Sequence, residues 1–286
     1  MKMFVQTRRV ARGLVLGLLL GLSLGPAQAQ IKTGDNPEAS PIWQKVRVSL
    51  FGTRAIASAA DDVIVLDTPV RAEDAAVVPI AVRTRFAQSA TRYVDKLYLI
   101  IDNNPSPISA VFQFTPQSGR ADIETRVRVD EYTHVRAIAE LNDGSLFMAV
   151  RWVKASGGCS APPGKDAQAA LATLGRMKLR VEGDAQAEAK GGSAPVLAQL
   201  MISHPNNSGL AMDQLSRQFT PAHFVRRVDI SYGGKPLMSA DVDFSISENP
   251  NFRFYFTPQG AGELKAEVLD SRDLRFHSSI DYRPAP

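Results

Sequence analysis

Short segments in which apolar and polar residues alternate, separated by turn-forming residues, recur through most of this 286-residue chain. The segments are enriched in Val, Ile, Thr and aromatic residues, as strands are, and the Asn, Gly and Pro residues between them favour turns. Strands are expected at 46–50, 62–66, 76–86, 94–101, 108–114, 122–129, 134–141 and 146–153, and then at 196–203, 224–232, 236–244, 252–256, 263–269 and 275–282. This spacing predicts an all-β protein built from antiparallel sandwiches.

Residues 156–195 separate the two sets of strands and have a different composition. Cys159 follows Gly157 and Gly158 and precedes Ser, Ala, Pro, Pro and Gly, so no apolar periodicity is available to bury it. We therefore expect an exposed thiol on a mobile arm. An alanine-rich stretch at 165–177 favours a helix, and the small polar residues of 183–195 favour a flexible linker. The predicted organisation is a sandwich over 30–155, an arm and linker over 156–195, and a sandwich over 196–286.

Residues 1–29 have the pattern of a cleaved export signal. A basic start precedes an apolar run over 13–25 and a small-residue site, Ala27-Gln28-Ala29. The run is shorter than the roughly 20 apolar residues of a membrane-spanning helix, so we expect no membrane insertion after the signal is removed. Thr7-Arg8-Arg9 resembles a twin-arginine signal, which leaves the Sec and twin-arginine routes open. The mature protein is expected outside the cytoplasm.

Net charge excludes two classes of partner. The formal net charge of +4 comes from the first 29 residues, which contain four of the 33 Lys and Arg residues and no acidic residue. The remainder carries 29 basic and 29 acidic residues and is close to neutral. Binding to nucleic acid or to an anionic membrane surface needs a basic excess, so neither is expected.

The chain contains one cysteine, Cys159, and few histidines. A single cysteine in an exported protein cannot form an intrachain disulfide, so it is free, modified or joined to another molecule. No CxxCH motif is present, which excludes covalently attached c-type haem. The histidines are scattered, without metal-ligand spacing: His134, His204, His223 and His277. We therefore expect no metal site, no cofactor and no catalytic residue, since a thiol enzyme needs a positioned base.

A short internal repeat suggests two related modules. Phe112-Gln113-Phe114-Thr115-Pro116-Gln117 follows an Asn-Pro turn, and Phe254-Tyr255-Phe256-Thr257-Pro258-Gln259 follows another. Alternating residues of a strand face one side, so both phenylalanines of each motif are expected in the core.

These motifs resemble the SoxY and SoxZ carrier proteins of bacterial sulfur oxidation, joined in one chain. Residues 42–160 are similar to SoxY, through motifs that include Asn104-Pro105-Ser106-Pro107, Phe112-Gln113-Phe114-Thr115-Pro116 and Gly157-Gly158-Cys159. Residues 196–282 are similar to SoxZ, through Met201-Ile202-Ser203-His204-Pro205, Pro221-Ala222-His223-Phe224-Val225 and Glu248-Asn249-Pro250. The resemblance implies two immunoglobulin-like sandwiches without an active site, joined here by a flexible, partly helical linker.

The resemblance also implies a role for Cys159 as the residue to which sulfur compounds are attached covalently, with Gly157 and Gly158 as the hinge of its arm. In the family the arm ends the chain, whereas here a second module follows, and Ser160 and Ala161 replace the two trailing glycines. The implied function is a periplasmic carrier of thiosulfate-type intermediates that is not itself an enzyme. Its partners would be periplasmic sulfur-oxidation enzymes.

Two other functions stay open. Fused chains of this kind also resemble carriers associated with quinoprotein (PQQ-dependent) dehydrogenases, so the alternative is a non-enzymatic accessory protein of such a dehydrogenase and its cytochrome. A thiol enzyme or redox sensor would require a strongly lowered pKa of Cys159. Only Lys154 and Lys165 lie close enough in sequence to lower it, which favours activation by a partner.

Overall fold

Strands are the main regular secondary structure in a computed structural model that describes residues 36–59, 62–162, 171–182, 194–213 and 216–284. The first half contains η1 (Pro37–Ala39), α1 (Pro41–Phe51), β1 (Ile56–Ser58), β2 (Ile64–Asp67), β3 (Val78–Thr84), β4 (Val94–Ile101), β5 (Ile108–Phe114), η2 (Pro116–Ser118), β6 (Ile123–Val127), β7 (Thr133–Leu141) and β8 (Leu146–Val153). The second half contains β9 (Met177–Glu182), β10 (Val196–Ile202), β11 (Val225–Tyr232), β12 (Lys235–Val242), β13 (Asn251–Phe256), β14 (Gly262–Asp270) and β15 (Arg275–Tyr282). Within these ranges no helix has the length and apolar character to cross a membrane.

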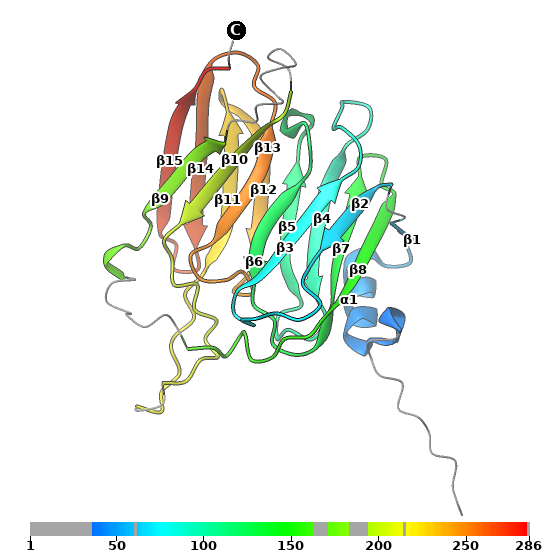
Figure 1. The fold of residues 1–286 in the computed structure, drawn as a ribbon, viewed down its shortest axis with the longest axis vertical. Coiled ribbons are helices and arrows are strands. Elements are labelled where there is room, and N and C mark those ends of the chain that lie inside the picture. The colour runs from blue at the N-terminus through cyan, green and yellow to red at the C-terminus, as the bar shows by residue number, and fades with distance from the viewer. Residues whose placement is uncertain (1–35, 60–61, 163–170, 183–193, 214–215, 285–286) are drawn as a thin grey trace, which may run out of the picture. The chain divides into compact units, whose positions relative to one another are not determined.

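Two sheets run through both halves of the chain (Figure 1). The nine-stranded sheet has the order β1-β8-β7-β4-β5-β12-β11-β14-β15, and the six-stranded sheet has the order β2-β3-β6-β13-β10-β9. The halves meet where β5 pairs with β12 and β6 pairs with β13, both antiparallel. The predicted all-β, immunoglobulin-like fold is confirmed, and the structure adds that the sheets are continuous from one module to the other.

The main hydrophobic core lies between the two sheets and contains the phenylalanines of both F-x-F motifs. Phe112, Phe114, Phe254 and Phe256 are buried, as alternation along a strand requires. Burial of each such side chain contributes on the order of 1.5–3 kcal/mol. The motifs lie on β5 of the nine-stranded sheet and on β13 of the six-stranded sheet. In the nine-stranded sheet the strands of the second half mirror those of the first about the junction, so the strand that corresponds to β5 is β12. The internal repeat therefore does not mark equivalent strands.

The segment expected as a strand at 46–50 is instead the last part of α1. Ser40 caps this helix by accepting a hydrogen bond from the backbone N–H of Trp43, and Pro41 occupies its first turn. Trp43 and Phe51 pack against the nine-stranded sheet in a second, smaller apolar cluster with Tyr98 and Ile138. Helical spacing, rather than alternation, thus decides which of these residues are buried.

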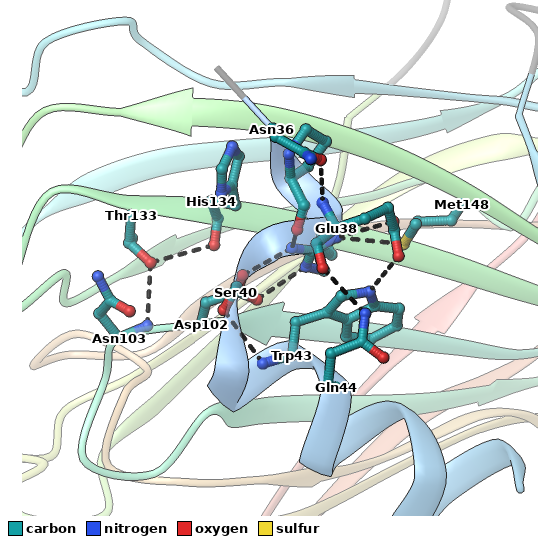
Figure 2. Close-up of polar contacts among 12 residues, drawn as sticks. Asn36, Glu38, Ser40, Trp43, Gln44, Asp102, Asn103, Thr133, His134 and Met148 are labelled. Atoms are coloured by element: carbon teal, nitrogen blue, oxygen red, sulfur yellow. Dashed lines mark hydrogen bonds and ion pairs between the residues drawn. The ribbon is translucent and has the colours of Figure 1, made fainter. Parts of the chain in front are cut away.

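A buried ion pair fixes the start of the first module beneath α1. Arg136 of β7 is fully buried and donates two hydrogen bonds to Asp102, 2.8 and 2.7 Å long. Its guanidinium lies 4.3 Å from the ring centroid of Trp43, and the indole N–H of Trp43 donates to Glu38 (Figure 2). Nη1 of Arg136 also lies 3.8 Å from Oε1 of Glu38, so the segment before α1 is attached to the sheet by charge as well as by apolar packing.

The region expected as arm and linker, 156–195, contains a strand. Met177–Glu182 forms β9, which pairs with β10 at the edge of the six-stranded sheet. Of the helix expected at 165–177, Leu171 and Ala172 are helical and 173–177 are not, while residues 163–170 lie outside the described residues. The export signal at 1–29 and most of the linker at 183–195 also lie outside them.

Candidate functional site

After β8 the chain leaves the sheet and runs toward the loops between β10 and β11 (Figure 1). Backbone hydrogen bonds attach this segment, residues 156–162, to the connection between β6 and β7. The N–H of Gly157 donates to the carbonyl of Asp130, and the N–H of Gly158 donates to the carbonyl of Val129. We call residues 156–162 the arm, and in this structure the arm is docked.

The two glycines expected as a hinge have different surroundings. A Cβ atom added to Gly158 would lie 2.1 Å from the carbonyl oxygen of Ala75 and 2.7 Å from that of Val129, so only glycine fits the docked position. Gly157 has a φ of +80°, which disfavours other residues, but has open space around it. Gly158 is therefore required by the docked arm. The hinge role of both glycines stays a prediction.

Cys159 is buried, with 1% of its surface exposed, and the expectation of an exposed thiol is wrong. Its N–H donates to the carboxylate of Asp130, 3.2 Å away. Its carbonyl accepts a hydrogen bond from the hydroxyl of Ser208, 2.5 Å away. Asp130 belongs to the first half and Ser208 to the second, so the two modules bury the cysteine together. It lies outside both hydrophobic clusters of the protein.

Burial of Cys159 raises the pKa of its thiol to about 12. The negative charges of Asp130 and Asp243 act in the same direction, whereas the positive charge of Arg128 opposes them. Because the thiolate is the reactive form, the docked cysteine is a poor nucleophile at neutral pH.

Arg128 joins the two halves beside the cysteine. This residue is 5% exposed, and its Nη1 donates to the carbonyl oxygens of Asn206, Phe244 and Ile246. Asn104 supports the same region, because its side-chain amide donates to the carbonyl of Arg128 and accepts from the N–H of Asp130. The floor beneath Cys159 is therefore built from segments of both modules.

The loop that carries Ser208 is fixed by Asn206, whose φ of +47° lies in the left-handed region that asparagine tolerates. Its side chain donates to the carbonyl of Ile246 and accepts from the N–H of Val225. Its backbone N–H donates to Nδ1 of His204, 3.1 Å away. Every polar group of Asn206 thus has a partner.

Two of the scattered histidines meet around one carboxylate, which their sequence spacing did not indicate. Nε2 of His223 lies 2.7 Å from Oδ2 of Asp270, and Nε2 of His204 lies 3.5 Å from the same oxygen. The three side chains are buried, and they are the group among the described residues whose ligand atoms could hold a metal ion. His204 and His223 are 19 residues apart and Asp270 a further 47, so only the fold brings them together.

The protonation of His204 follows from its neighbours. Since a backbone N–H donates to Nδ1, this nitrogen is an acceptor, and the proton of the neutral ring is on Nε2, facing Asp270. A protonated Nε2 is not available to a metal ion, and this nitrogen is buried 3.5 Å from Oδ2 of Asp270 without a hydrogen-bond partner among the described residues. Burial and the charge of His223 lower the pKa of His204 to about 4.

The other two histidines lie elsewhere. His134 packs edge-on against Trp152, and His277 is exposed on β15.

The fold and this site define an all-β protein of two immunoglobulin-like modules in which the cysteine of one module is held by a loop of the other. Residues 47–159 match the family model of sulfur oxidation protein SoxY, and residues 183–281 match that of sulphur oxidation protein SoxZ. The chain belongs to these families as a SoxY module followed by a SoxZ module. We refer to its halves by these names below.

Several solved structures are similar over part of the chain. The sulfur carrier protein SoxY from Chlorobium limicola f thiosulfatophilum is 23% identical, with 40% of this chain and 91% of that chain covered and a TM-score of 0.32. A superoxide reductase (neelaredoxin) from Ignicoccus hospitalis is 15% identical, with 32% and 79% covered and a TM-score of 0.29. No curated protein matches the chain. Because the structural likenesses are distant, the assignment rests on the two family models.

Proposed function

We propose that this chain is a periplasmic carrier of sulfur oxidation that holds thiosulfate-type intermediates covalently on Cys159 while partner enzymes process them. One observation carries the proposal: the SoxY match ends at Cys159, the single cysteine of the chain, and the arm places this residue against the SoxZ module. Export by the signal at 1–29 would bring the protein to the compartment of those partners.

The chemistry of loading requires a partner that accepts electrons. Joining the Cys159 thiol to the outer sulfur of thiosulfate forms one S–S bond, releases the thiol proton and removes two electrons. No disulfide partner within the chain can take these electrons, since the chain has no second cysteine. The oxidant is therefore a redox centre of a partner protein. A later hydrolysis of the terminal sulfonate as sulfate needs only water.

Loading also requires the arm to leave its docked position, because the buried thiol has a raised pKa. The arm is held by hydrogen bonds at Gly157, Gly158 and Cys159, and the cysteine belongs to neither hydrophobic cluster. Each hydrogen bond contributes on the order of 0.5–1.5 kcal/mol. Release therefore costs a few kcal/mol, which the binding of a partner can supply while both sheets stay folded.

Intact-mass measurement tests this function. Protein isolated from its native host during growth on thiosulfate should carry added mass that a reductant removes, and Cys159→Ser should lack it. Protein from cells grown without reduced sulfur is the control. An unmodified Cys159 under thiosulfate feeding would contradict the carrier function.

A second candidate is a non-enzymatic accessory protein of a quinoprotein dehydrogenase and its cytochrome. The unreactive state of the docked thiol favours it, and so does a groove of about 840 Å³ lined by β4, β5, β11, β12 and β14. This groove crosses the junction of the modules and offers a protein-binding surface that does not involve the thiol. Here Cys159→Ser should leave capture of the dehydrogenase and the host phenotype unchanged, whereas a lost phenotype would exclude this candidate.

A further inference from the structure

We propose that residues 204–209 of the SoxZ module form a latch that keeps Cys159 closed, and that Ser208 is the residue that positions the arm. This inference rests on the proposed function only in taking Cys159 as the residue to be loaded. It gives the SoxZ module a specific task, which is to control access to the cysteine of the SoxY module.

The direction of the Ser208 hydrogen bond is fixed by its two contacts. The hydroxyl oxygen accepts a hydrogen bond from the backbone N–H of Leu210, 3.1 Å away, so that contact does not use the hydroxyl proton. The proton therefore points to the other neighbour, the carbonyl oxygen of Cys159, 2.5 Å away. The hydrogen bond of the latch is therefore made to the backbone of the cysteine and not to its side chain.

Contacts on the side of the loop away from the arm hold the latch in place. His204 faces Asp270, and the backbone and side chain of Asn206 form hydrogen bonds with Arg128 and with the carbonyl of Ile246. Ser208, two residues further on, forms the hydrogen bond with the arm. Neither the loop nor the arm has regular secondary structure, but the loop is anchored, because His204 and Asn206 are buried and Asn207 pairs with His223 in an isolated β-bridge. We therefore expect the loop to stay in place when the arm opens.

The same loop makes a second contact with the SoxY module. Arg128 of that module donates to the carbonyl of Asn206, two residues before Ser208. Displacement of the loop would therefore break both the Ser208 hydrogen bond to Cys159 and the Arg128 hydrogen bond to Asn206. Because the two contacts would be lost together, we assign control of the cysteine to the whole loop, residues 204–209.

Removal of the Ser208 hydroxyl should favour the open arm without unfolding the protein. A hydrogen bond of about 1 kcal/mol corresponds to roughly a fivefold change in the population of the open state. Alkylation of the thiol follows that population when opening and closing are fast relative to the reagent. The alkylation rate of Cys159 is therefore expected to rise roughly fivefold when the Ser208 hydroxyl is removed.

The experiment is the rate of iodoacetamide alkylation of Cys159 in the full-length protein at pH 8, without cargo or partner. Ser208→Ala should react about 5- to 10-fold faster than the unaltered chain, and Ser208→Thr, which keeps the hydroxyl, should stay within twofold of it. Ser216→Ala is the matched control, since Ser216 lies further along the same connection and its hydroxyl accepts from the N–H of Gln218.

Urea unfolding of the same variants separates opening from unfolding. The latch predicts that Ser208→Ala is alkylated faster and that its rate stays constant in urea well below the unfolding midpoint, because opening of the arm exposes little surface. An alkylation rate within twofold of the unaltered chain would overturn the latch, and so would a rate that rises with urea as steeply as global unfolding does. The alkylation assay needs no sulfur compound, so it can succeed when no adduct is found in cells, and the two proposals fail separately.

Discussion

The hydroxyl of Ser208 lies 2.5 Å from the carbonyl oxygen of Cys159, although the two residues belong to different modules. In a carrier made of two separate chains such a contact would depend on their association. Here the connection from 160 to 207 makes it intramolecular, which raises the effective concentration of the latch at the arm. The fused chain therefore favours the closed cysteine at any protein concentration.

Replacement of Gly158 by alanine should open the arm. The added Cβ would lie 2.1 Å from the carbonyl oxygen of Ala75, so the docked position becomes inaccessible while the sheets are untouched. We expect Gly158→Ala to be alkylated at least tenfold faster than the unaltered chain, with a loss of stability of about 1–3 kcal/mol. Gly260→Ala is the control, because Gly260 has open space and a φ of +87°, which strains alanine at a different turn. Equal alkylation rates for the two variants would show that the contact at Gly158 does not hold the arm.

Alkaline pH should destabilise the protein through Cys159. Burial raises the pKa of the thiol from 9.0 to about 12, so the folded state keeps a proton that the unfolded state loses. The stability from this group is complete below pH 9 and declines as pH rises toward 12. At pH 10.5 the decline amounts to about 2 kcal/mol relative to Cys159→Ser.

The measurement is the urea midpoint of both proteins from pH 8 to 10.5. Tyr98 and Tyr232, whose pKa values are also raised, are present in both proteins, so their contribution to the pH dependence cancels in the comparison. If the urea midpoints of the two proteins fell in parallel as pH rises, the thiol would not be buried.

Acidic pH should destabilise the protein through His204. Burial, and then the charge of His223, lower the pKa of His204 from 6.5 to about 4, so the unfolded state binds a proton that the folded state does not. Stability is therefore lost as pH falls from about 6.5 toward 4, by up to about 3 kcal/mol. His204→Gln, whose side-chain amide does not titrate, should flatten this decline between pH 7 and 4.5.

Two charged groups face His204, namely His223 and Asp270. The pKa of Asp270 lies below its usual value, because hydrogen bonds from His223 and the backbone outweigh burial, so its own titration falls below the measured range. A decline in His204→Gln as steep as in the unaltered chain would assign the acid sensitivity to other groups.

Loss of the Arg136 side chain should destabilise the SoxY module strongly. Arg136→Met leaves Asp102 buried without its two charged hydrogen bonds and removes the cation from the face of Trp43. Removal of one partner of a buried pair costs about 3–5 kcal/mol, which the urea midpoint will show. Arg226→Met removes an exposed pair with Asp273 and should cost less than about 1 kcal/mol. Similar losses in both variants would mean that burial does not set the strength of the Arg136 pair.

Strand positions were largely predictable because apolar alternation is a local property. The segment 94–101 coincides with β4, and 108–114 coincides with β5. The error at 46–50 arose where five alternating residues matched a strand, while the cap at Ser40 and the wider spacing of Trp43 and Phe51 indicated a helix. β9 was also indicated by the alternation of Met177, Leu179 and Val181, but the helix expected at 165–177 took in Met177, and residues 178–182 were assigned no element.

The site could be predicted only in part, because its geometry depends on distant contacts. The single cysteine and its glycines were evident from the sequence, and they identify the residue. Burial of Cys159 depends on Asp130 and Ser208, which are 29 and 49 residues away in sequence. Composition around a residue does not report contacts at that separation, so the inference from local glycine and proline to an exposed thiol failed.

The central claim is that one sulfur atom of this chain, stored closed at the junction of its modules, carries the cargo. The most direct measurement is the mass of the peptide containing Cys159, digested without reductant from protein isolated during growth on thiosulfate. The account predicts an added sulfur-containing group on this peptide alone, released by reductant. A peptide of unmodified mass from actively oxidising cells would contradict it.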